Sequence, residues 1–209
     1  MKNVIIFGDS YSTFAGFIPE GFAHYYAKDS RPQMGVMALE DTWWHKVIAK
    51  TGDKLIQNNS WSGSTIGYTG YGGADCSSTS SFIFRFRKLR DSGFFEKEKI
   101  DKVYVFGATN DSWSNAPLGS LKTDITESDL YSVLPAIDHF LSSVKECLPD
   151  AEIVCIINTG LKSEITDAFV TVCERLGIKK IILSDIDKID GHPTALGMEQ
   201  IAEQVVGNV

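Results

Sequence analysis

A serine and a histidine at distant points of the chain have the types that nucleophilic catalysis requires. Ser10 lies in the triplet Gly8-Asp9-Ser10, directly after a short apolar run. A serine hydroxyl is a weak nucleophile until a neighbouring base removes its proton. His192 lies beside Asp190, just before the last helical pattern, a position suited to general-base work. Each feature alone is more typical of a turn or a structural histidine, so only their joint occurrence indicates chemistry.

Two further motifs contain groups that could donate hydrogen bonds to a developing negative charge. Residues 58–63 (NNSWSG) end in Gly63, where the missing side chain lets a backbone N–H approach a ligand. Residues 107–111 (GATND) contain Asn110, whose side-chain amide can donate to an oxyanion. Taken singly, each motif is typical of a polar turn.

Short apolar runs alternate with helical patterns and would position these motifs. Strands are predicted at residues 4–7, 54–57, 103–106, 153–157 and 180–183, and their β-branched and aromatic content is typical of a parallel sheet buried on both faces. Helices are predicted at residues 42–50 (with Asp41 as N-cap), 82–90, 129–148, 165–176 and 195–206. The alternation predicts one α/β domain over residues 1–209, a three-layer α/β/α sandwich with a flavodoxin-like, mostly five-stranded parallel sheet.

Two long connections, residues 11–40 and 63–81, follow the first two motifs at the carboxyl edge of the predicted sheet. Ligands bind at this edge in open α/β folds, and connections of this length are usually functional or disordered. The first connection is rich in aromatic residues, and Trp61 and Trp113 lie beside the second and third motifs. We therefore expect Asp9, Trp61 and Trp113 to contact substrate, although packing is the commoner role of any single aromatic residue.

In this order, the motifs resemble the four sequence blocks of the SGNH, or GDSL-type, serine hydrolase superfamily. They read GDS after the first strand, N-x-x-x-S-G after the second, G-x-x-N-D after the third, and His-Pro near the carboxyl end. The resemblance implies that Ser10 is the nucleophile of a carboxylic ester hydrolase and His192 its base. It also implies that the N–H groups of Ser10 and Gly63 and the amide of Asn110 form an oxyanion hole, with no cofactor.

The aspartate that should orient the histidine departs from the family pattern. The family places it three residues before the histidine, as D-x-x-H, but Ile189 occupies that position here. The nearest carboxylates belong to Asp190 and, further upstream, Asp187, and we favour Asp190. A Ser–His dyad oriented by a backbone carbonyl is a third arrangement.

The resemblance does not select a substrate, because the superfamily includes carbohydrate esterases, lysophospholipases, thioesterases and arylesterases. No hydrophobic lid segment stands out, which favours a short, acetyl-type acyl group over a lipid chain. Aromatic side chains would suit a sugar ring or an acyl chain about equally. An acylated sugar or a similar small ester is therefore the expected partner, with a lysophospholipase or thioesterase as the alternative.

Composition argues against several other classes of function. The net charge of −7 disfavours a nucleic-acid surface or an anionic membrane patch. The first apolar run is too short for a secretory signal, and no segment approaches the roughly 20 apolar residues of a membrane span, so a cytoplasmic location is expected. The cysteines show no metal-binding spacing, and two of them, Cys155 and Cys173, are expected to be reduced core residues.

In two alternatives to the esterase function, Ser10 has no catalytic role. A flavodoxin-like module could bind a phosphate or flavin on residues 9–13, and it would need neither Gly63, Asn110 nor His192. A superfamily member that has lost activity is suggested by the missing D-x-x-H aspartate. Covalent labelling of Ser10 by a fluorophosphonate probe distinguishes a working enzyme from both.

Overall fold

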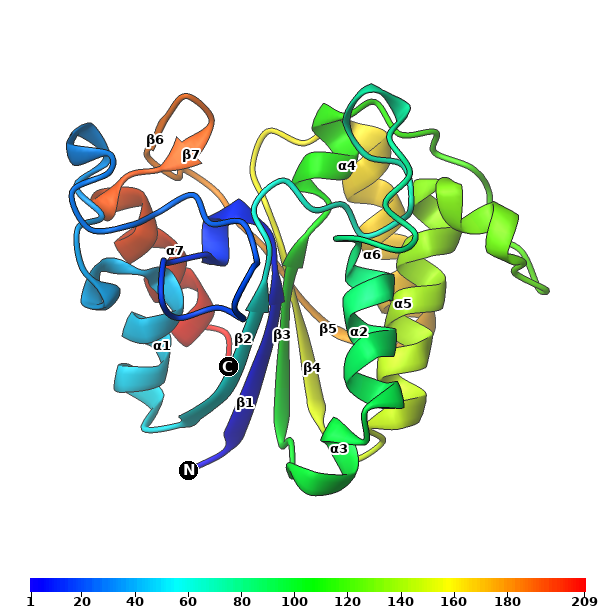
Figure 1. Cartoon of the computed structure of the whole chain (residues 1–209), viewed down its shortest axis with the longest axis horizontal. Helices are drawn as coiled ribbons and strands as arrows, with labels where there is room; N and C mark the ends of the chain where they lie inside the picture. The colour runs from blue at the N-terminus through cyan, green and yellow to red at the C-terminus, as the bar shows by residue number, and fades with distance from the viewer.

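Five parallel strands form the central sheet of the computed structural model, which describes residues 1–209. The strands are β1 (Asn3–Gly8), β2 (Lys54–Ser60), β3 (Lys102–Gly107), β4 (Glu152–Ile157) and β5 (Lys179–Ile182). Their order across the sheet is β2-β1-β3-β4-β5, and every neighbouring pair is parallel (Figure 1). All five predicted strands are confirmed.

Helices cover both faces of this sheet. On one face lie α1 (Trp43–Thr51) and α7 (Ala195–Val206), and on the other α2 (Phe82–Asp91), α5 (Val133–Cys147) and α6 (Ser163–Leu176) (Figure 1). The short α3 (Phe94–Lys97) precedes β3. This arrangement confirms the predicted three-layer α/β/α sandwich. None of the helices combines the length and apolar character that crossing a bilayer demands.

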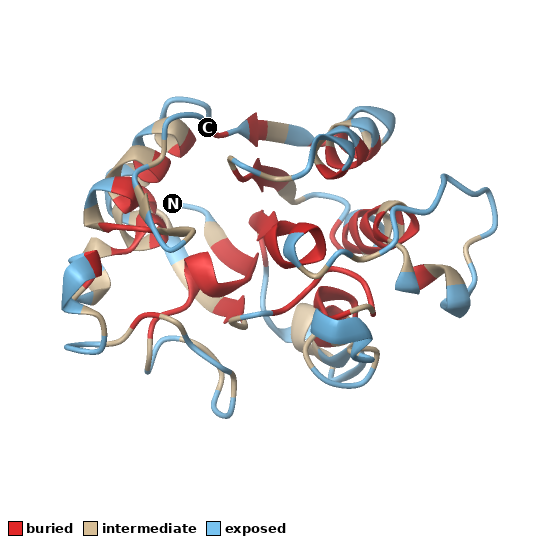
Figure 2. Ribbon diagram, turned by 90° about the horizontal axis from the view of Figure 1, so that it is seen from above, coloured by how far each residue is buried: buried red, intermediate tan, exposed pale blue.

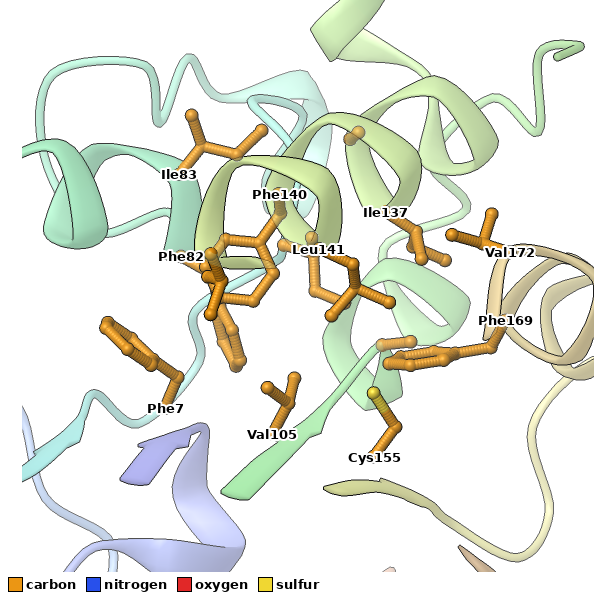
Figure 3. Close-up of a cluster of buried hydrophobic side chains, with 14 of the residues drawn as sticks. Phe7, Phe82, Ile83, Val105, Ile137, Phe140, Leu141, Cys155, Phe169 and Val172 are labelled. Atoms are coloured by element: carbon orange, nitrogen blue, oxygen red, sulfur yellow. The ribbon is translucent and has the colours of Figure 1, made fainter. Parts of the chain in front are cut away.

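Alternate residues of the strands supply two separate cores. Phe7 of β1, Val105 of β3 and Cys155 of β4 point toward α2, α5 and α6, where they meet residues such as Phe140 and Phe169 (Figure 3). The intervening strand residues pack against α1 and α7. Because successive side chains of a strand point to opposite faces, burial of both faces explains the continuous apolar runs. Cys155 and Cys173 are buried free thiols in the first core, as expected.

Two helix boundaries differ from expectation. The N-cap of α1 is Thr42, whose hydroxyl accepts from the backbone of residue 45, whereas the Asp41 carboxylate accepts from the N–H groups of residues 37 and 38. The single helix expected over residues 129–148 is a 3₁₀ turn, Glu127–Tyr131, followed by α5. Pro135 lacks an N–H and fits only the first turn of a helix, so α5 begins just before it.

Connecting segments gather at the carboxyl ends of the strands, the upper end in Figure 1. They include α4 (Thr109–Trp113) and a small antiparallel hairpin of β6 (Lys188–Ile189) and β7 (His192–Pro193). Seen from above in Figure 2, buried residues lie on the sheet and on the inward faces of the helices, while the outer loops carry much of the exposed surface. All four motifs meet at this end of the sheet.

Candidate functional site

Ser10 lies two residues beyond the end of β1, at the start of a 3₁₀ turn (Ser10–Ser12). The turn is capped by Asp9, whose Oδ1 accepts a hydrogen bond of 3.0 Å from the Tyr11 N–H. Gly8 is required before it, because a Cβ at that position would lie 2.6 Å from Cβ of Ser12. The tight turn therefore places the Ser10 hydroxyl at the edge of the sheet.

Asp9 does not have the position expected of a substrate-binding residue. It is fully buried, and burial raises the pKa of its carboxyl to about 7 against the opposing hydrogen bond from Tyr11. A carboxyl without exposed surface cannot contact a bound molecule. The expectation of substrate contact is therefore wrong, and Asp9 supports the turn that carries Ser10.

His192 faces Ser10 because of a two-residue turn between β6 and β7. Asp190 and Gly191 form this turn with positive φ angles of 49° and 76°. Asp-Gly is a favoured sequence for two-residue turns with φ > 0 at both positions, a signal that the sequence analysis did not use. The resulting hairpin brings Nε2 of His192 within 3.0 Å of Oγ of Ser10, across 182 residues of sequence.

Side chains from three other segments hold this hairpin in place. The Tyr11 hydroxyl donates to the carbonyl of Gly191, and the Tyr26 hydroxyl donates to the carbonyl of residue 193 at 2.7 Å. Lys188 Nζ donates to the Asn158 side chain at 3.0 Å, in the segment after β4. Burial lowers the pKa of this lysine to about 8. These bonds fix the imidazole relative to β1 and β4.

A backbone carbonyl, rather than a carboxylate, orients the imidazole. Nδ1 of His192 lies 3.2 Å from the main-chain oxygen of Asp190, and the Asp190 carboxylate makes no hydrogen bond to the ring. The carboxylate of Asp187 accepts from the Thr194 hydroxyl instead. The tight turn directs the peptide group, not the side chain, toward the ring. The expected role of the Asp190 carboxylate is thereby corrected in favour of the third arrangement.

An aromatic stack further restrains the imidazole. The Tyr25 ring lies parallel to that of His192, with centroids 3.6 Å apart and an interplanar angle of 4°. The Arg31 guanidinium lies 4.1 Å from the Tyr25 centroid, and steric exclusion puts it on the opposite face of that ring. Burial lowers the pKa of His192 below its usual 6.5, its bond to the Asp190 carbonyl opposes this, and the charges of Arg31 and Lys188 lower it further.

This geometry gives a direct prediction for Asp190→Asn. The substitution keeps the backbone carbonyl and a residue type that tolerates positive φ, so we expect kcat/KM for an ester to stay near the wild-type value. An orienting carboxylate would behave differently, because an Asp→Asn change in a Ser-His-Asp triad lowers kcat by about 10⁴. Steady-state kinetics of the variant distinguish the two, and a loss of that size would restore the carboxylate role.

Gly63 and Asn110 lie in the segments that follow β2 and β3, the two strands that pair with β1. The φ of Gly63 is 82°, its backbone N–H has no acceptor in the protein, and a Cβ there would meet no atom within 4 Å. Asn110 is 2% exposed, and its Nδ2 donates to the Ser64 carbonyl at 2.9 Å. That bond uses one of the two amide hydrogens and leaves the other available. Gly63 and Asn110 therefore each keep an N–H that makes no hydrogen bond within the protein.

A buried carboxylate ties the second motif to the third. Ala108, at φ 68°, turns the chain from β3 into α4. Asp111, in α4, accepts hydrogen bonds from the N–H groups of Ile66 at 2.9 Å and Gly67 at 3.3 Å. Burial raises the pKa of Asp111 to about 6, and these two bonds oppose the rise. The loop that carries Gly63 is thus fixed to the helix that carries Asn110.

Arg85 of α2 forms hydrogen bonds to both the first and the second motif. The sequence analysis did not identify this residue. Its buried guanidinium donates to the Gly8 carbonyl at 3.2 Å, to Asn59 Oδ1 at 2.8 Å and to Ser64 Oγ at 3.1 Å. Burial lowers its pKa to about 9, while the charge of Asp9 opposes this. The available signal was an arginine within the apolar face of an amphipathic helix.

The two tryptophans have different neighbours. Trp113 is partly exposed and packs edge-on to His192, with centroids 5.6 Å apart. Trp61 packs against Phe22 at 4.4 Å and lines a cavity of about 620 Å³ with Glu20 and Gln57. Phe84, Leu89 and Lys88 also line this cavity, so its wall combines apolar and charged side chains.

Comparison with known proteins agrees with these motifs. The family model described as "GDSL-like Lipase/Acylhydrolase" matches residues 2–209. Solved structures of candidate GDSL-like lipases from Bacteroides ovatus and Bacteroides uniformis are each 42% identical, with TM-scores of 0.91. The first match covers 98% of this chain and 96% of that one, and the second covers 100% and 95%. A search of the curated proteins finds no significant match.

More distant structures share the fold. An acetyl xylan esterase from the rumen bacterium Butyrivibrio proteoclasticus is 16% identical with a TM-score of 0.61, and the match covers 99% of this chain and 62% of that one. At this identity the likeness concerns the arrangement of helices and strands alone.

Proposed function

Because the chain belongs to the GDSL-like lipase/acylhydrolase family, we propose that it is a serine esterase with Ser10 as nucleophile and His192 as general base. One observation carries the proposal: the 3.0 Å contact between Ser10 Oγ and His192 Nε2. A hydroxyl hydrogen-bonded to an imidazole that is itself oriented by a third group is the arrangement that activates a serine.

In the acylation step, Ser10 Oγ attacks the ester carbonyl carbon as Nε2 of His192 takes its proton. The carbonyl oxygen becomes an oxyanion, held by the N–H groups of Ser10 and Gly63 and the amide of Asn110. The C–O bond to the alcohol then breaks, and His192 returns the proton to the leaving alkoxide. The product of this half-reaction is an acyl-enzyme on Ser10 and a free alcohol.

Deacylation repeats these roles with water. His192 removes a proton from a water molecule, whose oxygen attacks the acyl carbon, and the same donors hold the second oxyanion. Collapse breaks the bond to Ser10 Oγ, which takes the proton back from the imidazolium. A fixed imidazole is useful in both steps, since one ring must act as base and then as acid.

For the substrate we propose a short, acetyl-type ester of a carbohydrate. Two cavities have volumes of about 600 Å³, and neither is lined by Ser10 or His192, which supports a small acyl group. The Trp61 cavity borders the second motif, and its aromatic wall with Glu20 and Gln57 beside it is compatible with a sugar ring. Structures with the same fold include the acetyl xylan esterase.

A turnover screen tests this function. Acetylated mono- and oligosaccharides are compared with p-nitrophenyl esters of two, four, eight and twelve carbons, with Ser10→Ala protein as the blank. We expect the acetylated sugars and the two-carbon ester to have the highest kcat/KM. A preference for the eight- or twelve-carbon ester would contradict the short-acyl proposal.

The pH dependence follows from the lowered pKa of His192. The general base must be neutral, so kcat/KM should rise with pH through a midpoint below 6.5 and be level at pH 7 to 8. The measurement is kcat/KM for p-nitrophenyl acetate in buffers of constant ionic strength. A midpoint above 6.5 would mean that the imidazole is not buried in the free enzyme as described.

A further inference from the structure

The hydroxyl of Tyr71 contacts the side-chain amide of Asn110. Its hydroxyl donates a hydrogen bond of 2.8 Å to Asn110 Oδ1, across 39 residues of sequence. The same amide donates from Nδ2 to the Ser64 carbonyl. Burial raises the pKa of the Tyr71 hydroxyl above its usual value, and the charges of Asp9 and Asp111 add to the effect. The hydroxyl therefore remains a donor at neutral pH.

Tyr71 lies in a short loop, residues 69–75, whose two ends are joined by hydrogen bonds. An isolated β-bridge joins Thr69 to Asp75, and the N–H of Gly70 donates to the Ala74 carbonyl at 2.8 Å. At the base of this loop, the Thr69 hydroxyl donates a hydrogen bond of 2.7 Å to the carbonyl of residue 131. Tyr71 is 47% exposed, so little of its ring is needed for packing. Its most specific contact is the bond to Asn110.

The amide of an asparagine can turn about its last bond and is useful in an oxyanion hole only when one N–H points at the substrate oxygen. The Ser64 carbonyl accepts from one N–H, and Tyr71 donates to the oxygen at the other end of the group. The two bonds fix the plane of the amide, and donation to Oδ1 polarises the remaining N–H. Donors that are fixed before the reaction need no reorganisation as charge develops.

We propose that Tyr71 is a positioning residue that holds and polarises the Asn110 amide for oxyanion stabilisation. The proposal rests on the esterase function above and adds a residue that neither the motifs nor the family blocks include. Tyr71 acts through Asn110 and needs no contact with the substrate. Its loss should therefore lower kcat rather than raise KM.

The test is a double-mutant cycle with Tyr71→Phe, Asn110→Ala and the double variant, assayed on p-nitrophenyl acetate. Loss of one hydrogen bond should lower kcat about three- to tenfold in Tyr71→Phe, with KM and Tm unchanged. In the Asn110→Ala background the same change should have no further effect, since its target is gone. Tyr104→Phe, which removes a tyrosine hydroxyl that has no hydrogen-bond partner, serves as control.

Two outcomes overturn the inference while leaving the esterase intact: an unchanged kcat in Tyr71→Phe, or an equal loss with and without Asn110. Turnover that persists in Ser10→Ala would instead refute the esterase. The NMR signals of the Asn110 side-chain amide give a reading that needs no turnover. They should shift in Tyr71→Phe and not in Tyr104→Phe, and signals that stay unchanged in Tyr71→Phe would also overturn the inference.

Discussion

Ser10→Ala should abolish ester hydrolysis. Loss of the nucleophile from a Ser-His site lowers kcat on the order of 10⁶-fold, so turnover should fall to the background of the buffer. The fold should be retained, because the only hydrogen bond of the Ser10 hydroxyl is to His192. Initial rates on p-nitrophenyl acetate, together with thermal unfolding of both proteins, measure the two effects.

The matched control for this variant is Ser120→Ala, which changes an exposed serine outside the four motifs. It should hydrolyse the ester at the wild-type rate. If Ser10→Ala did the same, the nucleophile would be another residue, and the contact with His192 would be structural.

Asn110→Ala should lower kcat by about 10²–10³ while KM changes little. This is the usual cost of removing one oxyanion donor, since the charge it stabilises exists only in the transition state. The variant also loses the bonds to Ser64 and Tyr71, so its Tm is measured beside its kinetics. The kinetic measurement is the kcat and KM of the folded protein on p-nitrophenyl acetate.

A different result would assign Asn110 another role. A raised KM with unchanged kcat would mean that the amide binds the substrate in its ground state. A large fall in Tm with little effect on the kcat of the folded fraction would mean that the residue only packs the loop of the second motif against α4.

The strands of the sheet could be predicted from the sequence because each strand signal is a short, local run of apolar residues. Residues 4–7 and 103–106 are apolar on both faces, and β1 and β3 pack against helices on both faces. The first three motifs follow β1, β2 and β3, and parallel strands bring their carboxyl ends to one edge of the sheet. The fold could therefore be predicted from residue types and their order, whereas the pairing of Ser10 with His192 was expected from the resemblance to the SGNH superfamily.

The orientation of individual groups could not be predicted in the same way. Whether the carboxylate or the backbone carbonyl of Asp190 accepts from the His192 ring depends on two φ angles in a turn. The D-x-H spacing in the sequence is compatible with both arrangements. Asp9 is polar and beside the nucleophile, yet its turn buries it. The break between residues 131 and 133 depends on where Pro135 is tolerated. These are tertiary and backbone effects, which hydrophobic periodicity does not record.

Contacts between loops were the least predictable part of the site. Tyr71 contacts Asn110 and Tyr25 stacks on His192, and both come from segments with no motif of their own. Tyr25 is of particular interest, because its ring restrains an imidazole that no carboxylate orients. An aromatic residue in a long connection was visible in the sequence, but its partner across the fold was not.

Intact-mass spectrometry of the protein treated with a fluorophosphonate, followed by peptide mapping, tests the central claim most directly. The reagent bonds covalently to an activated serine, so the claim requires one adduct per chain, located on Ser10. An unlabelled protein, or an adduct on a different residue, would contradict it.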